Sequence, residues 1–211
     1  MVDDMVRTWV AGWAVSRGTP PPAERPWGYY IEVADDPAEV GRHVLPEASR
    51  AAVRAAAEAV TVPRTWMKMP AEPDEVEPWI TPGWEVARSE TGYLMAVDLT
   101  ATGATAPAGY TAHVERAGDV VRVRVRHAAG GPAAAGQLAL LGEDAVVDRI
   151  RTQEAHRRRG LGAFVMRALA DRAVELGAVR GVLGATPAGR ALYRELGWRQ
   201  HATLAECVYR G

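Results

Sequence analysis

The sequence predicts an α/β (α+β) protein in which helices pack on a β-sheet. Three observations predict it. Apolar residues recur at three- and four-residue spacing over residues 160–176, which is typical of a helix with one buried face. Strand-like segments at 145–152 and 179–185 flank this helix, and a second helix and a last strand follow at 187–196 and 203–209. This alternation indicates a sheet covered by helices.

The first hundred residues contain weaker signals. Residues 18–26 are rich in proline, so we expect an extended connector without regular structure after a short N-terminal piece. Residues 46–60 are rich in alanine at helical spacing and predict a helix with Pro46 in its first turn. The elements expected next are a strand at 65–69, a brief helix at 74–80, one or two strands within 85–99, and a loop over 100–109.

Two strands at 110–115 and 120–126 are separated by Ala117-Gly118-Asp119, which favours a hairpin turn. Three valines alternate with three arginines in the second of them, so one face of the strand is apolar and the other cationic. A further strand at 133–141 leads through residues 142–144 into the strand at 145–152. Gly177 and Gly197 are expected to end the two helices that follow.

The composition bounds the class of protein. The chain has 211 residues, of which 48% are hydrophobic and 24% charged, as in soluble globular proteins. A formal net charge of -1 argues against nucleic acid as a partner. Residues 1–15 contain no long apolar run, so we expect neither a signal peptide nor a membrane partner. Cys207 is the single cysteine, which is compatible with a reducing, cytoplasmic location.

A loop between a strand and a long helix carries the strongest functional signal. It reads His156-Arg157-Arg158-Arg159-Gly160-Leu161-Gly162. The glycines let the backbone approach a ligand closely, and the N–H groups at the start of the helix have no partners within it. The helix dipole and the arginines add positive charge, so the loop suits a pyrophosphate. The alternatives are a basic cluster for nucleic acid and a solvated helix start.

Two motifs in this half of the chain resemble the GNAT superfamily of N-acetyltransferases. Arg157-x-x-Gly160-x-Gly162 resembles the acyl-CoA loop of that family. The segment from Thr186 to Trp198 resembles its second signature, a helix with an Asn-x-x-Ala-x-x-Leu-Tyr-x-x-x-Gly-Phe pattern. This chain departs from that pattern at Thr186, Gly189 and Trp198. The resemblance covers roughly the last hundred residues and implies a mixed, largely antiparallel central sheet flanked by helices.

The resemblance also implies an acetyl-CoA site and a reaction. The pantetheine arm would pair with the strand at Ile150, Arg151 and Thr152, and an N–H near Ile150 could polarise the thioester carbonyl. Tyr193 would protonate the departing thiolate, although a tyrosine in an apolar helix stripe also suits a core position. The other residues expected to hold the cofactor are Arg157, Arg158, Arg159, Gly160, Leu161, Gly162, Ala163, Thr186 and Arg190.

The general base is less clear from the sequence. The position at which family members often carry a carboxylate is Val146 here. Asp148 lies two residues further along and on the same strand face, so it is the candidate, with Glu143, Asp144 and three histidines (His113, His127 and His201) as alternatives. The five histidines are scattered without the spacing of metal ligands, and we expect no metal.

The acceptor cannot be identified from the sequence. We expect a primary amine, on a small or amino-acid-like molecule or on a peptide, and the chain could form a homodimer. A protein N-terminus or lysine acetyltransferase and a catalytically silent acyl-CoA-binding module are the alternative functions. Six of the seven tryptophans precede residue 85, and we expect them to pack between the two halves rather than to line an acceptor pocket.

The order of elements in the first half parallels that in the second. In each, a helix, a strand, a short helix and a Gly-Trp pair precede a strand, with Gly83-Trp84 matching Gly197-Trp198. Residues 1–100 are therefore a candidate degenerate half-copy of the acetyltransferase-like domain expected at 108–211. Chance similarity between two α/β segments is the alternative.

Overall fold

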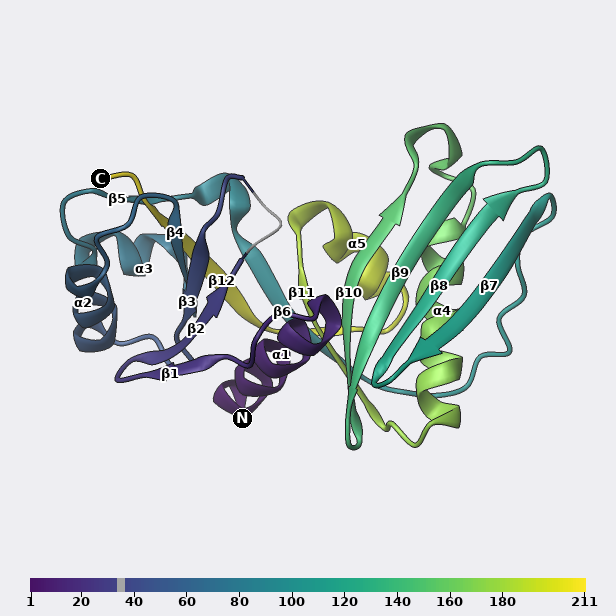
Figure 1. Cartoon of the computed structure of the whole chain (residues 1–211), viewed down its shortest axis with the longest axis horizontal. Coiled ribbons are helices and arrows are strands. Elements are labelled where there is room, and N and C mark those ends of the chain that lie inside the picture. The colour runs from purple at the N-terminus through teal and green to yellow at the C-terminus, as the bar shows by residue number, and fades with distance from the viewer. Residues whose placement is uncertain (34–36) are drawn as a thin grey trace.

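The computed structural model describes residues 1–33 and 37–211, and within them twelve strands form a single sheet (Figure 1). The strand order is β1-β2-β3-β4-β12-β6-β11-β10-β9-β8-β7, and β5 pairs with β12 beside this path. Two pairs in the described chain are parallel, β3 with β4 and β10 with β11, and the others are antiparallel. The predicted mixed, largely antiparallel sheet flanked by helices is confirmed.

The structure has five α-helices and three short 3-10 helices in its described part. The α-helices are α1 (Val2–Arg17), α2 (Arg50–Ala59), α3 (Pro73–Val76), α4 (Leu161–Glu175) and α5 (Pro187–Glu195), and the 3-10 helices are η1 (Glu77–Trp79), η2 (Arg88–Glu90) and η3 (Glu154–His156). The strands are β1 (Ala23–Arg25), β2 (Gly28–Glu32), β3 (Gly41–Val44), β4 (Thr65–Pro70), β5 (Trp84–Val86), β6 (Gly92–Asp98), β7 (Tyr110–Ala117), β8 (Val120–His127), β9 (Pro132–Leu141), β10 (Asp144–Thr152), β11 (Arg180–Ala185) and β12 (Arg199–Tyr209).

The short N-terminal piece is the 16-residue helix α1. Two predictions for the region that follows it were wrong. The proline-rich connector contains β1, because pairing with β2 gives its remaining backbone groups partners. Pro46 lies outside α2, since the Ser49 hydroxyl caps that helix by accepting a hydrogen bond from the Ala52 N–H at 3.2 Å.

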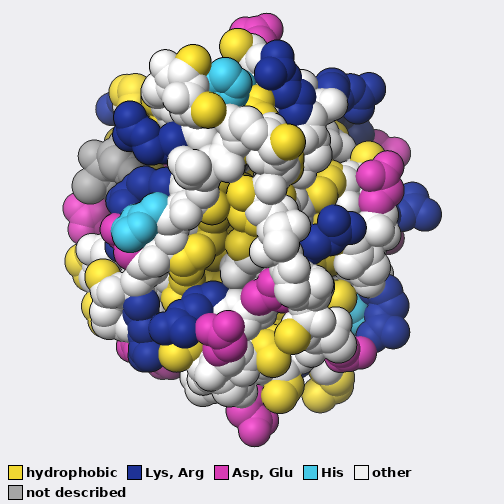
Figure 2. All heavy atoms as spheres, turned by 90° about the vertical axis from the view of Figure 1, so that its right-hand side faces the viewer, with side chains coloured by type: hydrophobic (Ala, Val, Ile, Leu, Met, Phe, Trp, Pro, Cys, Tyr) yellow, Lys and Arg dark blue, Asp and Glu magenta, His cyan; other side chains and the backbone are white. Residues whose placement is uncertain are grey.

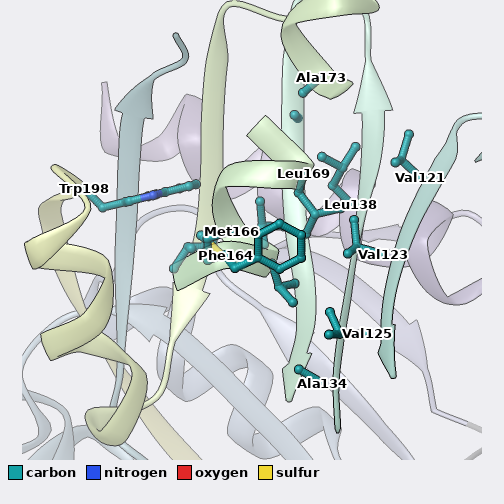
Figure 3. Packing of buried hydrophobic residues seen from close by; sticks show 14 of the residues in the cluster. Val121, Val123, Val125, Ala134, Leu138, Phe164, Met166, Leu169, Ala173 and Trp198 are labelled. Carbon is teal, nitrogen blue, oxygen red and sulfur yellow. The ribbon is translucent and has the colours of Figure 1, made fainter. Parts of the chain in front are cut away.

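Helices cover both faces of the sheet. One face is covered by α1, whose Val6, Trp9 and Trp13 pack on apolar residues of β6, β10, β11 and β12. Figure 1 shows α1 crossing in front of the strands and α4 behind them. On the α4 face, Phe164, Met166 and Leu169 pack against the valines of β8 and against β9, as Figure 3 shows. The predicted alternation along β8 is confirmed, since its valines are buried.

Two strands are exchanged between the early and late parts of the chain. The early strand β6 lies between β11 and β12, while the last strand, β12, lies between β4 and β6. The sheet therefore continues from one half of the molecule into the other. The tryptophans pack between the two halves only in part. Trp9 and Trp13 pack on the late strands, whereas Trp84 is buried in a cluster with α2 and β4.

A buried histidine should make the stability of this fold depend on pH. His43 on β3 is 6% exposed, and its Nδ1 accepts a hydrogen bond from the Trp27 Nε1–H at 3.1 Å. Burial, aided by Arg25, lowers the pKa of His43 to about 4. The unfolded chain takes up this proton near pH 6.5 and the folded chain does so only near pH 4. Stability should therefore fall as the pH drops through this window, by up to about 3 kcal/mol.

Urea unfolding between pH 7 and pH 4 measures this loss. The variant His43→Gln keeps a side-chain acceptor for Trp27 and removes the titrating group. The difference in unfolding free energy between the two proteins should change steadily over this pH range. An unchanged difference would show that His43 is not held neutral by the fold.

Candidate functional site

The parallel strands β10 and β11 separate along their length. They are paired only where residues 144–146 of β10 face residues 180–182 of β11. Beyond Val146 the two strands diverge, and β10 continues for six more residues to Thr152. Such an opening exposes main-chain donors and acceptors between two strands, so an extended ligand can pair there as an additional strand.

A β-bulge lies in β10 beside this opening. The pairing of β10 with β9 shifts between Asp148 and Arg151, and Arg149 adopts a left-handed conformation with φ 56°. A non-glycine residue in this region costs free energy and often marks a functional position. The bulge turns the strand so that Ile150 points toward α4, next to Val165 and Leu169, while Arg151 is exposed and Thr152 is partly exposed.

The glycine-containing loop leads directly from this strand into α4. Gly160 is the N-cap of α4 in a left-handed conformation with φ 76°, and Arg158 is also left-handed with φ 61°. The first bond within the helix runs from the Phe164 N–H to the Gly160 carbonyl at 2.9 Å. No described group accepts a hydrogen bond from the N–H groups of Leu161, Gly162 and Ala163. They face the same end of the helix and suit an anion.

Close packing explains the second glycine of the loop. A Cβ atom on Gly162 would lie 3.0 Å from the Leu192 Cδ2 atom on α5 and 3.8 Å from the Thr152 hydroxyl. Gly162 therefore lets the start of α4 approach Leu192 of α5 and the end of β10. The side chains of Arg157 and Arg158 are exposed beside the loop, and that of Arg159 donates to the Tyr110 hydroxyl at 3.2 Å. Positive charge thus surrounds the N–H groups at the start of α4.

The helix α5 brings Tyr193 to the same face of the sheet as α4. Tyr193 is partly buried against the α4 cluster, and its ring centroid lies 6.2 Å from that of Trp198. A Cβ atom on Gly189 would lie 3.0 Å from the Tyr193 ring. Glycine at position 189, where the GNAT pattern has alanine, gives this ring its space.

The Tyr193 hydroxyl is held in its protonated form. Burial, followed by the nearby negative charge of Asp148, raises the pKa of Tyr193 to about 12. The phenol therefore stays neutral over the whole physiological pH range. A neutral phenol can give a proton to a leaving group, which is what the sequence motif requires of it.

Two other predicted residues on α5 have structural roles that the motif did not reveal. The Thr186 hydroxyl caps α5 by accepting from the Gly189 N–H at 3.2 Å. The Arg190 guanidinium lies 4.2 Å from the centre of the Tyr93 ring, and its buried Nε atom has no partner in the described chain. Threonine can replace the asparagine of the family pattern at the start of the helix, because both residues are good N-caps.

Asp148 lies on the opposite face of the sheet, toward α1. Its carboxylate accepts hydrogen bonds from the Arg17 Nε atom at 2.9 Å, from the Arg17 Nη2 atom at 3.0 Å and from the Ser16 hydroxyl at 3.1 Å. These donors bind Asp148 to the end of α1. Its role as general base stays a prediction.

The other candidate bases lie elsewhere. Asp144 pairs with Arg180 at 2.6 Å at the paired end of β10 and β11, away from the opening. Among the histidines, His127 stacks near His156, at 5.3 Å between ring centroids, beside the glycine loop. His113 and His201 are exposed.

The pair formed by Arg17 and Asp148 should stabilise the fold measurably. The two side chains are 22% and 11% exposed, so each charge would be left partly buried without the other. We expect Asp148→Asn to lower the free energy of unfolding by about 1–3 kcal/mol. Urea unfolding measures it. Glu175→Gln is the matched control, because the pair of Glu175 with Arg172 is exposed and should contribute little. Equal effects of the two substitutions would contradict this assignment.

A second carboxylate, which the sequence motifs do not single out, lies on the face that Asp148 occupies. Glu206 on β12 is 7% exposed, and its Oε2 atom pairs with the Lys68 Nζ atom at 2.7 Å. A Cβ atom on Gly92 would lie 3.4 Å from Glu206 Oε1 and 3.3 Å from the carbonyl oxygen of Ala185, the last residue of β11. An acidic residue within the apolar run Leu204–Val208 could have signalled it.

The charge on one face, the grouping of possible metal ligands and the length of the helices give three further observations. Figure 2 shows the face at the β7 edge, where Lys and Arg side chains are scattered around an apolar centre. Within residues 1–33 and 37–211, no three His, Cys, Asp or Glu side chains gather as metal ligands would. No helix in the described part of the chain is long and apolar enough to cross a membrane.

Comparisons with known proteins agree with this geometry. The model of the acetyltransferase (GNAT) family matches residues 74–198. A GCN5-related N-acetyltransferase from Kribbella flavida is 19% identical, with a TM-score of 0.67 over 98% of this chain and 96% of that one. A GCN5-related N-acetyltransferase-like protein from Streptococcus suis is 12% identical, with a TM-score of 0.61 over the whole of both chains.

A third solved structure is also similar. It is a tandem GNAT protein from the clavulanic acid biosynthesis pathway, 12% identical, with a TM-score of 0.56 over 98% of this chain and 94% of that one. At these identities the three likenesses establish a shared fold. No curated protein matches the chain.

Proposed function

Because the chain belongs to the GNAT acetyltransferase family and is an acyltransferase, we propose that it transfers an acetyl group from acetyl-CoA to a primary amine by direct attack. The observation that carries this proposal is the glycine loop at the start of α4, placed at the end of the strand that diverges from β11. The diphosphate would bind the N–H groups of Leu161, Gly162 and Ala163. The arginines Arg157, Arg158 and Arg159 would neutralise its charge.

The rest of the cofactor would follow the opening between β10 and β11. The pantetheine arm would pair with the main chain of Ile150, Arg151 and Thr152. Thr186 and Arg190 at the start of α5 lie on the other side of this opening and would bound it. A main-chain N–H near the bulge would polarise the thioester carbonyl.

The proposed reaction moves two protons. The acceptor ammonium gives its first proton to a carboxylate on the α1 face, and the neutral amine attacks the thioester carbonyl. A C–N bond forms, and the C–S bond breaks. Tyr193 protonates the thiolate and is reprotonated by the second proton of the amine nitrogen. The products are an amide, coenzyme A as the free thiol and one proton released from the carboxylate.

Two carboxylates are candidates for the first proton, Asp148 and Glu206. Asp148 already accepts three hydrogen bonds from α1, whereas Glu206 pairs with Lys68 through its Oε2 atom. The pH profiles of kcat/KM for Asp148→Asn and Glu206→Gln separate them. Loss of the acidic limb in one variant identifies the base, and its retention in both would remove both residues from this role.

The proposed function is tested by thiol release from acetyl-CoA in the presence of a panel of primary amines. We expect release that depends on both substrates. Binding of acetyl-CoA without release from any amine would favour the alternative of a silent acyl-CoA-binding module. Release with peptides alone would favour a protein N-terminus or lysine acetyltransferase.

We also propose that residues 1–100 are a degenerate half-copy of the unit at 108–211. In both, a parallel pair is joined by one helix, β3-α2-β4 in the first and β10-α4-β11 in the second. The first pair stays in register along the whole of β3, and α2 starts without a glycine loop. Only the second unit therefore offers an opening for a cofactor, and we expect one acetyl-CoA per chain.

A further inference from the structure

A charged cavity lies on the early side of the molecule, between β3, β4, β12 and η2. Its volume is about 740 Å³, within the range of small-molecule sites. Its lining includes four acidic and four basic side chains: Glu39, Glu85, Glu90 and Glu206, and Arg42, Lys68, Arg88 and Arg210. Equal numbers of both signs leave the cavity without a net charge. Such a lining does not favour an anion or a cation alone.

The charges deepest in this cavity are buried in pairs. Glu39 and Arg42 are 7% and 8% exposed and form an ion pair, and the Arg42 guanidinium lies 4.8 Å from the Trp13 ring. Lys68 and Glu206 form the second pair at 2.7 Å, and burial lowers the pKa of Lys68. Buried ion pairs contribute little net stability compared with apolar residues of similar size. Two adjacent pairs at the wall of a cavity therefore indicate a binding role.

One atom of the second pair is available to a ligand. Lys68 Nζ lies 2.7 Å from Glu206 Oε2, so Oε1 of this residue, which is 7% exposed, is the carboxylate oxygen farther from that cation. A Cβ atom on Gly92 would lie 3.4 Å from this oxygen and 3.3 Å from the Ala185 carbonyl oxygen. Glu206, which lines the cavity, therefore lies close to the end of β11, where the proposed thioester site begins.

We propose that this cavity binds the acceptor and that the acceptor is an amino acid or a close analogue with an adjacent carboxylate. This inference rests on the proposed function. The acceptor ammonium would bind Glu206 Oε1, at the end of the cavity near Ala185. Its carboxylate would bind Lys68 and the remaining donors of Arg42. Ammonium and carboxylate of an amino acid are attached to one carbon, so they match two opposite charges that lie side by side.

Other amines match this lining less well. A simple alkyl or aryl amine would displace the water that solvates Lys68 and Arg42. It would offer these cations no acceptor in place of that water, which costs free energy. A polyamine would bring several positive charges to a cavity whose charges already balance. An amino acid satisfies both signs.

The test compares each amino acid with the amine that lacks its α-carboxylate. The pairs are L-leucine with 3-methylbutylamine, L-phenylalanine with 2-phenylethylamine, and L-glutamate with 4-aminobutyrate, with acetyl-CoA saturating and thiol release as the readout. We expect kcat/KM to be at least about tenfold higher for the amino acid in at least one pair, because removing the carboxylate leaves buried cations unpaired.

The double variant Lys68→Met/Glu206→Gln assigns the preference to this cavity. Changing both partners avoids leaving one buried charge alone. The ratio of the two kcat/KM values does not depend on the fraction of folded protein, so a merely structural role of the pair would leave it unchanged. We expect the ratio to fall to about one, with acetyl-CoA affinity by calorimetry unaltered. The matched control is Arg172→Met on α4, which should keep the wild-type ratio.

The outcomes separate this inference from the proposed function. Release with the simple amines and no preference for any amino acid would overturn the inference and leave the proposed function standing. A preference that survives in the double variant would place the acceptor elsewhere and overturn it as well. No release with any acceptor would overturn both.

Discussion

Replacing Tyr193 by phenylalanine should lower kcat by about a hundredfold while leaving the affinity for acetyl-CoA unchanged. The substitution removes only the hydroxyl, which in our proposal protonates the departing thiolate, and general acid catalysis contributes rate factors of about this size. The ring that packs near Trp198 remains. Because the pKa of Tyr193 is raised to about 12, the wild-type rate should also show no loss from its ionisation below pH 10.

Steady-state thiol release and calorimetry with acetyl-CoA measure the two quantities. Tyr209→Phe is the matched control, since Tyr209 packs against Trp84 in the cluster formed with α2 and β4 and should not affect kcat. Full kcat in Tyr193→Phe would show that this tyrosine is a core residue, which was the alternative from the sequence.

Replacing Gly160 by valine should weaken acetyl-CoA binding by at least about tenfold. Gly160 has φ 76°, where a β-branched residue is strained by about 1–3 kcal/mol. Relief of that strain would move the N–H groups of Leu161 and Gly162 away from their common direction. About 1.4 kcal/mol of lost binding free energy corresponds to a factor of ten.

Gly177→Val provides a closely matched control for that substitution. Gly177 follows the other end of α4, has φ 91°, and like Gly160 has no atom within 4 Å of where a Cβ would lie. The two variants should lose similar stability, and only Gly160→Val should lose affinity. Equal acetyl-CoA dissociation constants in the two variants would show that the loop conformation does not matter for binding.

The sequence predicts the second half of the fold well, because its signals are local. The valines of β8 alternate with arginines, and α4 begins and ends at glycines, so pattern and turn chemistry agree there. The first half is harder to predict. The strands β2 and β3 are short and carry no clear alternation, and their pairing depends on partners distant in the sequence.

The residues of the candidate site also differ in how well the sequence predicts them. The loop before α4 and the tyrosine on α5 can be found from a motif, since each motif lies on a single element. The partners of Asp148 could not be found, because Arg17 lies 131 residues away and reaches it only through the packing of α1 on β10. The cavity around Glu206 needs β12 to lie beside β4, a pairing of the last strand with the early half.

The central claim is that the loop at Gly160–Gly162 binds the diphosphate of acetyl-CoA. Calorimetric titration of the wild-type protein with acetyl-CoA, and separately with S-acetylpantetheine, measures this directly because the second ligand keeps the thioester arm and lacks the diphosphate. We expect acetyl-CoA to bind at one site per chain and at least about tenfold more tightly than S-acetylpantetheine. Equal affinity for the two ligands, or no binding of acetyl-CoA, would contradict the account.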